Sequence, residues 1–413
     1  MEDLVTGWAD CRLCGTPLRQ TFVDLGLSPL ANSYLAAEEL ARGELFFPLH
    51  VYVCEQCLLV QLPMAATPEE IFSDYAYFSS FSDSWLEHAR RYVDAAVERF
   101  ALGRESRVVE IASNDGYLLQ YFVERGIPVL GIEPAANVAA AAVERGIPTS
   151  VEFFGAEVGS RLALEQQADL VLGNNVLAHV PDVHDLVEGM RLLLKPEGAI
   201  TMEFPHLLRL ILERQFDTIY HEHYSYFSLL TVERLFGDHD LELFDVEELP
   251  THGGSLRIYA RHAGLGEPEG RLVTLREVER AHGLNELDAY LDFEEAARSV
   301  KRDLLAFLIA AREDGRSVAA YGAAAKGNTL LNYCGIRADL VDYVVDRSPH
   351  KQGRFLPGTR IPIGPPEQVL ETRPDYLLIL PWNLRDEIVE QMSAVREWGC
   401  RFVIPIPQVT VLD

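Results

Sequence analysis

The chain has few basic residues for its size and no long apolar segment. Its 413 residues include 36 Lys and Arg against 63 Asp and Glu, which gives a formal net charge of −27 at pH 7. This charge repels nucleic-acid backbones and anionic membranes, so we expect neither as a partner. No apolar run reaches the ~20 residues of a membrane-spanning helix, and the acidic N-terminus has no signal-peptide core. These absences predict a cytoplasmic protein, and we expect a monomer.

Two common enzyme motifs are also missing. The turn after residue 110 has Ala112 and Asn114 where a dinucleotide-binding G-x-G-x-x-G turn has its first two glycines. The stretch YHEHYSYFS, residues 220–228, places His221 and His223 two apart, whereas the metalloprotease box H-E-x-x-H places them four apart. Neither a pyrophosphate cofactor at this turn nor a protease-type metal centre is therefore expected.

Four of the six cysteines are ordered as two C-x-x-C pairs. Cys11 and Cys14 form the first pair, and Cys54 and Cys57 form the second. In a reducing compartment this pattern is typical of a Cys₄ zinc site, in which four protein ligands close the tetrahedron. We therefore expect a structural Zn²⁺, and the long gap between the pairs should carry structure of its own.

Strands alternate with helices in two regions, which predicts an α/β fold with doubly wound parallel sheets. We expect a zinc-binding module over 1–68, a cofactor-binding domain over 69–265 and a Rossmann-like α/β domain over 266–413. The expected strands of the first sheet lie at 106–110, 128–133, 168–175 and 199–204, with a turn at 195–198 before the last. Those of the second lie at 317–321, 340–346, 374–383 and 400–407, and a helix over 294–314 links the two sheets.

Acidic side chains gather where the first two strands end. Glu110 and Glu133 occupy these strand ends, where an acidic residue can hold the ribose hydroxyls of a bound cofactor. Asp115 adds a negative charge where a dinucleotide would place its phosphates. A cofactor with a sulfonium and an ammonium group suits these charges better, so S-adenosylmethionine is expected. The candidate cofactor-binding residues are Glu110, Asn114, Asp115, Gly116, Glu133, Asn174 and Tyr77.

The order of these motifs, with LGNNVLAHV and LLLKPEGAITME after Glu133, resembles class I methyltransferases. With the Cys₄ module, the YHEHY stretch and the C-terminal GAAAKG turn, the whole chain resembles the sugar C-methyltransferases that act on TDP-linked 4-keto deoxysugars in antibiotic biosynthesis. The resemblance implies methyl transfer to a ring carbon, for which we favour C-3. Alternatives are C-5, O- or N-methylation of a sugar, or a nicotinamide-dependent sugar-modifying enzyme.

Carbon methylation requires a carbanion, which an adjacent ketone can stabilise as an enolate. The enzyme then needs a base for the carbon proton and donors for the enolate oxygen. The resemblance implies a site made of Tyr220, Glu222, His223, His179 and Tyr75. We assign His223 as the base, Glu222 as an orienting group, and Tyr220 and His179 as donors to the enolate. Strand alternation would separate Tyr220 from His223, so a loop or bulge is expected here.

The C-terminal GAAAKG turn, residues 322–327, has two interpretations. It is either a vestigial dinucleotide fold that binds nothing or the place where Lys326 and turn amides hold the diphosphate of a nucleotide sugar, which we favour. Arg347 and Lys351 add positive charge nearby. Ser255 and Arg257, in a predicted strand of the first sheet, complete the candidate substrate-binding residues.

Overall fold

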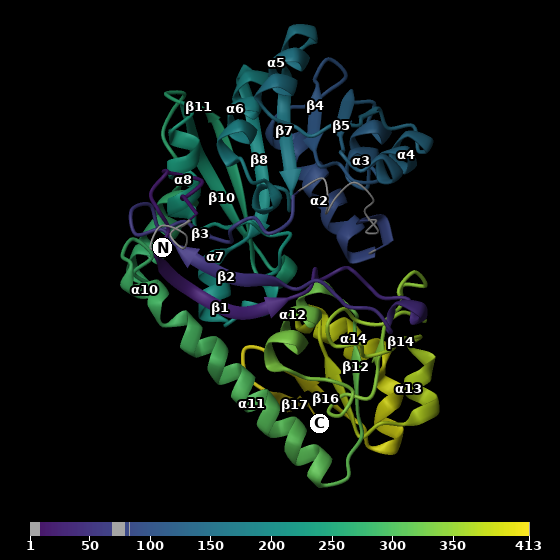
Figure 1. Ribbon diagram of the computed structural model, residues 1–413. Helices are drawn as coiled ribbons and strands as arrows, with labels where there is room; N and C mark the ends of the chain where they lie inside the picture. Colours follow the sequence, from purple (N-terminus) through teal and green to yellow (C-terminus); the bar gives the residue numbers. More distant parts are fainter. Residues whose placement is uncertain (1–8, 68–78, 82, 413) are drawn as a thin grey trace.

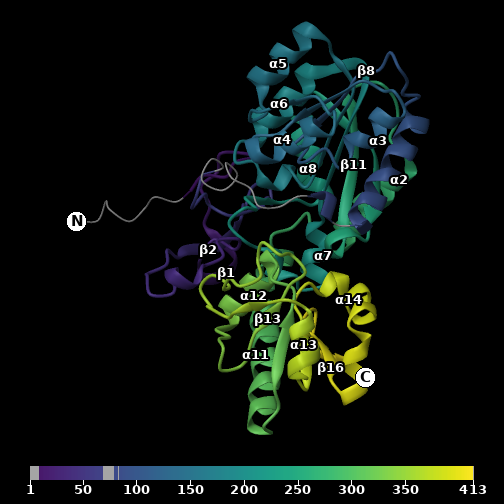
Figure 2. The same ribbon diagram turned by 90° about the vertical axis from the view of Figure 1, so that its right-hand side faces the viewer.

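The computed structural model describes residues 9–67, 79–81 and 83–412, and these residues form three β-sheets. The largest sheet forms the upper lobe in Figure 1 and the C-terminal sheet forms the lower lobe. Strands β1 (Gln20–Ser28) and β2 (Phe47–Val53) cross between the lobes, as Figure 2 shows from the side. None of the described helices is long and apolar enough to span a membrane.

The upper lobe contains a seven-stranded sheet of order β10-β11-β8-β7-β4-β5-β6. Only β11 runs antiparallel to its neighbours, which is the doubly wound arrangement that the sequence predicts. Its strands, in the order of the sheet, are β10 (Leu241–Leu249), β11 (Ser255–His262), β8 (Leu194–Pro205), β7 (Ala168–Asn174), β4 (Val108–Ile111), β5 (Val129–Ile132) and β6 (Thr149–Ser150). Its helices are α2 (Asp83–Arg99), α3 (Leu119–Glu124), α4 (Ala136–Glu144), α5 (Ala156–Glu165), α6 (Val183–Leu193), α7 (Leu207–Leu212), α8 (Leu229–Gly237) and α9 (Gly270–Ala281).

Helices cover both faces of this sheet, so its central strands are apolar on both sides. Every residue of β4 is buried. Val108 packs into the apolar cluster that contains α2 and α3, whereas Val109 packs into the cluster that contains α6 and α8. Because side chains alternate along a strand, Glu110 lies on the same face as Val108. The fold therefore places a carboxylate in an apolar layer below α2.

The segment Lys195-Pro-Glu-Gly198 differs from its prediction as a turn. It lies within β8, where Ala168 of β7 pairs with Leu194 while Leu170 pairs with Ala199. The residues between form a bulge in a continuous strand, because the pairing partners on both sides hold the chain in the sheet. The predicted turn is therefore wrong, although the strand after it is confirmed.

The N-terminal sheet is antiparallel and has the order β1-β2-β3-β9. Strand β3 (Val60–Gln61) pairs with β9 (Ser225–Tyr226), which follows the YHEHY stretch in the chain. Phe22 of β1 stacks on Phe293 at the start of α11, with ring centroids 4.4 Å apart. The zinc module thus packs against both other parts of the protein, and the exact domain boundaries stay a prediction.

The lower lobe has a six-stranded sheet of order β14-β13-β12-β15-β16-β17, which is parallel except for β17. The predicted linking helix is confirmed as α11. The strands and helices are α10 (Asp288–Leu291), α11 (Phe293–Glu313), β12 (Val318–Tyr321), α12 (Ala325–Cys334), β13 (Val344–Val345), β14 (Ile363–Gly364), α13 (Glu367–Thr372), β15 (Tyr376–Ile379), α14 (Arg385–Gln391), β16 (Arg401–Ile404) and β17 (Thr410–Leu412).

Helix α12 joins the two lobes. Tyr333 packs edge-on against Phe216, with ring centroids 5.2 Å apart, and the Thr329 hydroxyl donates to the Ile219 carbonyl at 2.9 Å. Phe216 belongs to the short 3₁₀ helix η4 (Phe216–Thr218), directly before the YHEHY stretch. The contact brings the start of α12, which carries Lys326, close to that stretch.

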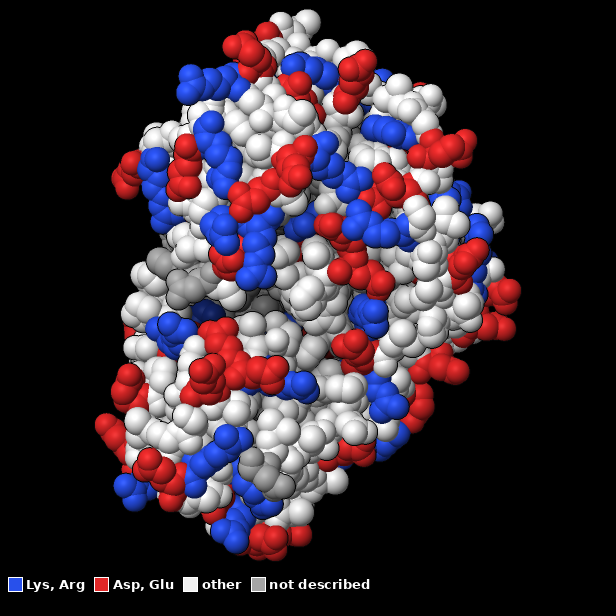
Figure 3. All heavy atoms as spheres, turned by 180° about the vertical axis from the view of Figure 1, so that it is seen from behind, with Lys and Arg blue, Asp and Glu red and all other residues white. Residues whose placement is uncertain are grey.

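Charged side chains of both signs are mixed over the face that Figure 3 shows. Acidic and basic residues alternate over both lobes on this side of the molecule. This face has no continuous basic stripe of the kind that follows a nucleic-acid backbone.

Candidate active site and metal centre

The four predicted zinc ligands lie together. The sulfur atoms of Cys11, Cys14, Cys54 and Cys57 are all within 4.8 Å of one another. Two of the separations, Cys11 to Cys57 and Cys14 to Cys54, are 3.4 and 3.5 Å. A tetrahedral zinc with Zn–S bonds of about 2.3 Å would place its sulfur ligands about 3.8 Å apart, so this cluster fits the ion. The loop between the two pairs contains β1 and β2, as the length of the gap predicts.

Arg12, inside the first C-x-x-C pair, connects this cluster to the YHEHY stretch. Its guanidinium donates to the Leu62 carbonyl at 2.9 Å and also to the carbonyl of Tyr224. Its backbone N–H donates to Gln61 Oε1 at 3.0 Å, and the Gln61 amide donates to the sulfur of Cys11 at 3.0 Å. The half-buried side chain of Arg12 therefore connects the cysteine cluster to the end of the YHEHY stretch.

Glu110 and Glu133 lie at the strand ends of the large sheet, where the sequence predicts the cofactor. Glu110 is fully buried, and neither of its carboxylate oxygens has a hydrogen-bond partner among the described residues. Burial raises the pKa of Glu110 well above its usual value, and the charges of Glu133 and Asp115 add to the increase. A buried carboxylate without partners is costly unless a ligand compensates it. A cationic ligand beside Glu110 would do so.

The turn after β4 keeps the shape of a glycine-rich turn without two of its glycines. Ala112 has φ of 54°, Asn114 has 49° and Gly116 has 76°, so all three take the left-handed conformation. For Ala112 this costs of order 1–3 kcal/mol, which the surrounding structure must offset. The Asn114 N–H donates to Glu133 Oε2 at 2.9 Å. Glu133, at the end of β5, thus holds the turn that follows β4.

Asp115 has partners within the protein. Its carboxylate pairs with Arg145 at 3.1 Å and accepts a hydrogen bond from the Ser80 hydroxyl. Asn174, at the end of β7, donates to the hydroxyl of Tyr117 at 3.3 Å. Trp85 of α2 stacks on Tyr117 with ring centroids 5.9 Å apart. Polar groups and a large aromatic surface therefore border the same strand ends.

The Tyr220–Tyr224 stretch is a turn, as expected from the need to bring alternate residues together. The ring of His223 lies 4.1 Å from that of Tyr220 and 4.6 Å from that of His179, measured between centroids. His179 comes from a 3₁₀ turn, η3 (Leu177–His179), which follows β7. Tyr75 and Tyr77 lie outside the described residues.

One hydrogen bond sets the tautomer of His223. Its Nδ1 lies 2.9 Å from the Thr218 carbonyl, which can only accept, so Nδ1 carries the proton and Nε2 keeps a lone pair. Burial lowers the pKa of His223 well below its usual value, and the nearby His179, His252 and Lys326 lower it further. The imidazole is therefore neutral near pH 7, with one nitrogen able to accept a proton.

Lys326 lies beside this cluster. Its ammonium donates to Asn383 Oδ1 at 2.8 Å and lies 4.8 Å from the centre of the Trp382 ring. The indole N–H of Trp382 donates to Asp217 at 2.8 Å. Burial raises the pKa of Asp217 to about 6, although the charge of Lys326 opposes the increase. Aromatic and acidic groups thus hold a cation next to the predicted base.

The other predicted substrate-binding residues are divided between two places. The Lys351 ammonium donates to the Ala323 carbonyl in the turn before Lys326, at 2.8 Å, whereas Arg347 is exposed and lies 3.6 Å from Glu387. Arg257 is buried between Glu203 and Glu247, and the Ser255 hydroxyl donates to the Thr251 carbonyl at 3.0 Å. Lys351 therefore accompanies Lys326, while Arg257 and Ser255 already have protein partners. Their contact with substrate stays a prediction.

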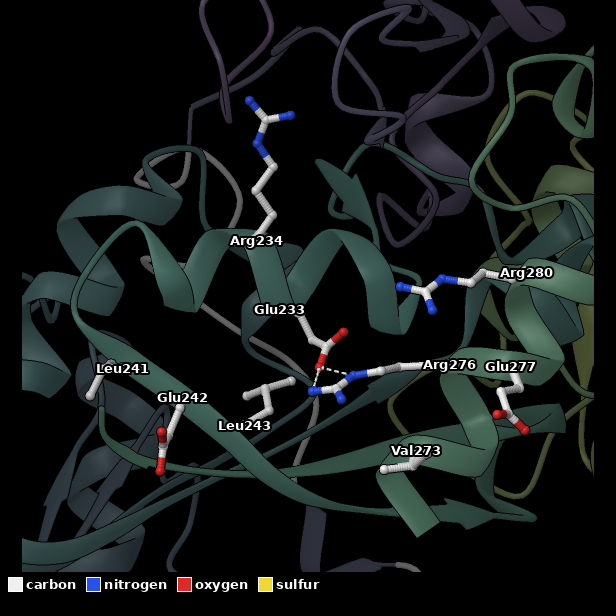
Figure 4. Close-up of a pocket in the computed structure, with 9 residues that line it drawn as sticks. All are labelled: Glu233, Arg234, Leu241, Glu242, Leu243, Val273, Arg276, Glu277 and Arg280. Atoms are coloured by element: carbon white, nitrogen blue, oxygen red, sulfur yellow. Dashed lines mark hydrogen bonds and ion pairs between the residues drawn. The ribbon is translucent and has the colours of Figure 1, made fainter. Parts of the chain in front are cut away.

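A hollow of about 550 Å³ lies between α8, β10 and α9, away from all of these residues. Figure 4 shows its charged lining, in which Glu233 pairs with Arg276 at 2.7 Å and Arg234 and Arg280 extend in different directions. No residue of the histidine cluster or of the cofactor turn borders it. It is therefore not the candidate active site.

Several site residues have no signal in the sequence. His252, Trp382 and Asn32 reach the cluster from separate parts of the chain, and Asp217 lies just before the YHEHY stretch without a motif of its own. Trp382 follows β15 at the carboxyl end of a parallel strand, and this position is the one signal that could have identified it.

Family models match most of the chain. The "Putative zinc binding domain" model matches residues 11–72, the "Methyltransferase domain" model residues 85–246, and the "C-methyltransferase C-terminal domain" model residues 250–407. The C-methyltransferase NovU from Streptomyces niveus is 39% identical over 418 aligned positions, which cover 100% of this chain and 99% of NovU. The chain belongs to the S-adenosylmethionine-dependent sugar C-methyltransferase family.

More distant relatives align with only part of this chain. A ubiquinone biosynthesis O-methyltransferase from Rhodopseudomonas palustris is 25% identical over 152 residues, 32% of this chain and 60% of that protein. The solved PH0226 protein from Pyrococcus horikoshii has a TM-score of 0.38 and 14% identity, covering 45% of this chain and 94% of that one.

The residues present fit both groups that the family uses, S-adenosylmethionine and structural zinc. The Glu110 carboxyl, which has no hydrogen-bond partner among the described residues, fits the positively charged cofactor, and the cysteine tetrad fits the metal. S-adenosylmethionine supplies an electrophilic methyl group on a sulfonium centre.

Loss of one cysteine should remove the metal and disturb the active site. We expect the wild-type enzyme to contain about one zinc per chain and Cys54→Ser to contain little, as measured by elemental analysis. Because Arg12 connects the cluster to Tyr224, turnover should also fall. Cys400→Ser is the matched control, since Cys400 is buried but remote from the tetrad. Full metal content in Cys54→Ser would contradict the assignment.

The Glu110→Gln variant should separate cofactor binding from stability. It removes the negative charge at nearly constant volume, so the affinity for S-adenosylmethionine should fall by roughly 1.5–3 kcal/mol, as for hydrogen bonds to charged groups. The ligand-free variant should not melt below wild type, because the raised pKa of Glu110 already disfavours its charged form and the described residues give its oxygens no hydrogen bond to lose. Calorimetry and thermal melts measure the two effects. A lower melting temperature with unchanged affinity would contradict the cofactor role of Glu110.

Proposed function

We propose that the enzyme transfers a methyl group to a ring carbon next to the ketone of a TDP-linked 4-keto deoxysugar, with His223 as the base. The observation that carries this proposal is the hydrogen bond from His223 Nδ1 to the Thr218 carbonyl, which leaves the Nε2 lone pair free to accept a proton. Methylation of oxygen or nitrogen would need no base for a C–H bond, so a buried neutral imidazole beside phenol and imidazole groups favours carbon methylation. The name of NovU, a C-methyltransferase, supports the same reaction class.

In the proposed reaction His223 Nε2 takes the proton from the carbon next to the ketone. The C–H electron pair forms a C=C bond, and the carbonyl electrons move to the ketone oxygen, giving an enolate. Tyr220 and His179 would donate hydrogen bonds to this oxygen. Their ring centroids lie 4.1 and 4.6 Å from that of His223. The ketone would then re-form as the enolate carbon takes the methyl group, and the electrons of the broken S–CH₃ bond would stay on sulfur as a neutral thioether.

We assign the reacting carbon as C-3 and place the diphosphate near Lys326 and Lys351. The position of Lys326 supports this arrangement, because its charge acts on His223 directly and a diphosphate lies only a few bonds from the reacting ring carbons. Product NMR after reaction with a TDP-4-keto sugar distinguishes C-3 from C-5. A role in antibiotic deoxysugar biosynthesis, a monomeric state and a cytoplasmic location stay predictions.

Substitution of the base should remove both turnover and proton exchange. We expect His223→Ala to bind S-adenosylmethionine and TDP almost normally and to lose at least ~10²–10⁴-fold in kcat, the usual contribution of a general base. It should also stop exchange of the sugar α-hydrogen with deuterated water, measured by mass spectrometry.

Tyr220→Phe is the matched comparison, because it removes a donor to the enolate and keeps the imidazole. It should lose rate while retaining some exchange. If Tyr220→Phe abolishes exchange and His223→Ala does not, the tyrosine is the base. If neither changes turnover, carbon methylation through this cluster is wrong.

The pH dependence should show a base that is already neutral below pH 7. kcat/KM reports the pKa values of the free enzyme, and burial lowers the pKa of His223 below its usual 6.5. A base works when it is unprotonated, so kcat/KM should be flat from pH 6.5 to about 8 and should fall only below that range. The Asp217→Asn variant shows how much of the fall of kcat/KM at low pH comes from protonation of the Asp217 carboxyl, whose pKa is about 6. An acid-limb midpoint at or above 6.5 in both proteins would contradict the neutral-base model.

A further inference from the structure

The segment that follows β1 leaves the N-terminal sheet and contacts both other domains. Leu35 forms a β-bridge with Phe355 of the C-terminal domain, and the Tyr34 hydroxyl donates to the Ala323 carbonyl at 2.6 Å. Asn32, two residues earlier, donates from its side-chain Nδ2 to Glu222 Oε1 at 2.6 Å. The zinc module thus supplies a direct contact to the carboxylate of the YHEHY stretch.

The contact joins an exposed donor to a buried acceptor. Glu222 is only 6% exposed, whereas Asn32 lies in a loop and is exposed. Because Asn32 is exposed, its side chain contributes little to packing. The main effect of its hydrogen bond is to restrict the orientation of the Glu222 carboxylate. The 2.6 Å distance between Asn32 Nδ2 and Glu222 Oε1 is short for an N–H···O hydrogen bond.

The loop that carries Asn32 is itself fixed by the substrate-binding turn. The Ala323 carbonyl accepts from both Tyr34 and Lys351, and the Lys351 ammonium also lies 5.4 Å from the centre of the Tyr34 ring. Ala323 lies three residues before Lys326. The position of Asn32, and through it that of Glu222, therefore depends on the turn to which we assign the diphosphate.

We propose that Asn32 is a positioning residue of the carbon-methylation site, whose amide orients the Glu222 carboxylate toward the bound sugar. The proposal rests on the function proposed above and extends the active site to all three domains. Glu222, so oriented, would accept a hydrogen bond from a hydroxyl or ammonium group of the sugar. Asn32 acts through Glu222 and does not touch the reacting atoms.

The charged and titratable groups around this contact come from each neighbouring element. Tyr34 lies on the same loop, while Lys351 and Asp346 face it from the C-terminal domain. His179 and His223 lie on the methyltransferase side, and the backbone of Glu222 interacts with His179. A second carboxyl introduced at position 32 would therefore interact most strongly with Glu222, its nearest partner.

The test compares Asn32→Asp and Asn32→Ala with Ser33→Ala, a control at an exposed neighbouring position of the same loop. We expect Asn32→Ala to lose about tenfold or more in kcat/KM, because small errors of orientation are costly in catalysis. In Asn32→Asp two carboxyls share one site, so one of them has a raised pKa. At low pH the protonated carboxyl can donate to Glu222 as the amide does, so activity relative to wild type should recover as pH falls from 9 to 6. Ser33→Ala should stay within twofold of wild type.

Two further measurements separate positioning from a structural role. Zinc content and TDP affinity should match wild type in all three variants, whereas affinity for the TDP-keto-sugar relative to TDP should follow the same pH trend in Asn32→Asp. The proposal would be overturned by wild-type activity in both Asn32 variants. It would also be overturned by an activity deficit that is equal in the two variants and independent of pH, or by loss of zinc. If the wild-type enzyme exchanges no sugar hydrogen with water, the proposed function fails. The affinity for the keto-sugar relative to that for TDP, compared between wild type and the Asn32 variants, still decides the role of Asn32.

Discussion

The hydrogen bond between His223 Nδ1 and the Thr218 carbonyl determines which atom of the site can take a proton. Without it the proton of the neutral imidazole could lie on either nitrogen. Molecules that carry it on Nε2 could not accept a proton at that atom. The bond exists because Thr218 ends a 3₁₀ turn that α12 and Trp382 hold from the C-terminal domain. The C-terminal domain thus positions the carbonyl that sets the tautomer of His223, the base that we propose.

Ionisable side chains of opposite sign gather in different lobes of the molecule. Carboxylates at Glu110 and Glu133 lie at the strand ends of the upper lobe, and the ammonium groups of Lys326 and Lys351 lie at the turn of the lower lobe. A cationic methyl donor and an anionic nucleotide would each find the opposite sign on its own side. Charge alone would then orient both ligands, although the chain as a whole is strongly acidic.

Features that depend on neighbouring residues could be predicted from the sequence, and features made by distant contacts could not. The cysteine pairs and the strand ends at Glu110 and Glu133 follow from local spacing, whereas the loop at Tyr220–Tyr224 follows from the family resemblance combined with strand geometry. The Lys195–Gly198 bulge was missed because turn residues can be absorbed into a strand when both sides stay paired. Asn32 and Asp217 gain their meaning only from partners in other domains, Glu222 and Trp382, and no local pattern marks such pairs.

The pairing of β3 with β9 has a consequence for the order in which the chain folds. Val60 pairs with Tyr226, so the fourth strand of the N-terminal sheet is synthesised only after β3 to β8. Domains usually fold as units during synthesis, from the N-terminus onward. Here the first module must wait with an open β-edge at β3, which is a site where chains can associate wrongly. Early metal capture by the cysteine pairs would hold the waiting strands in register until their partner arrives.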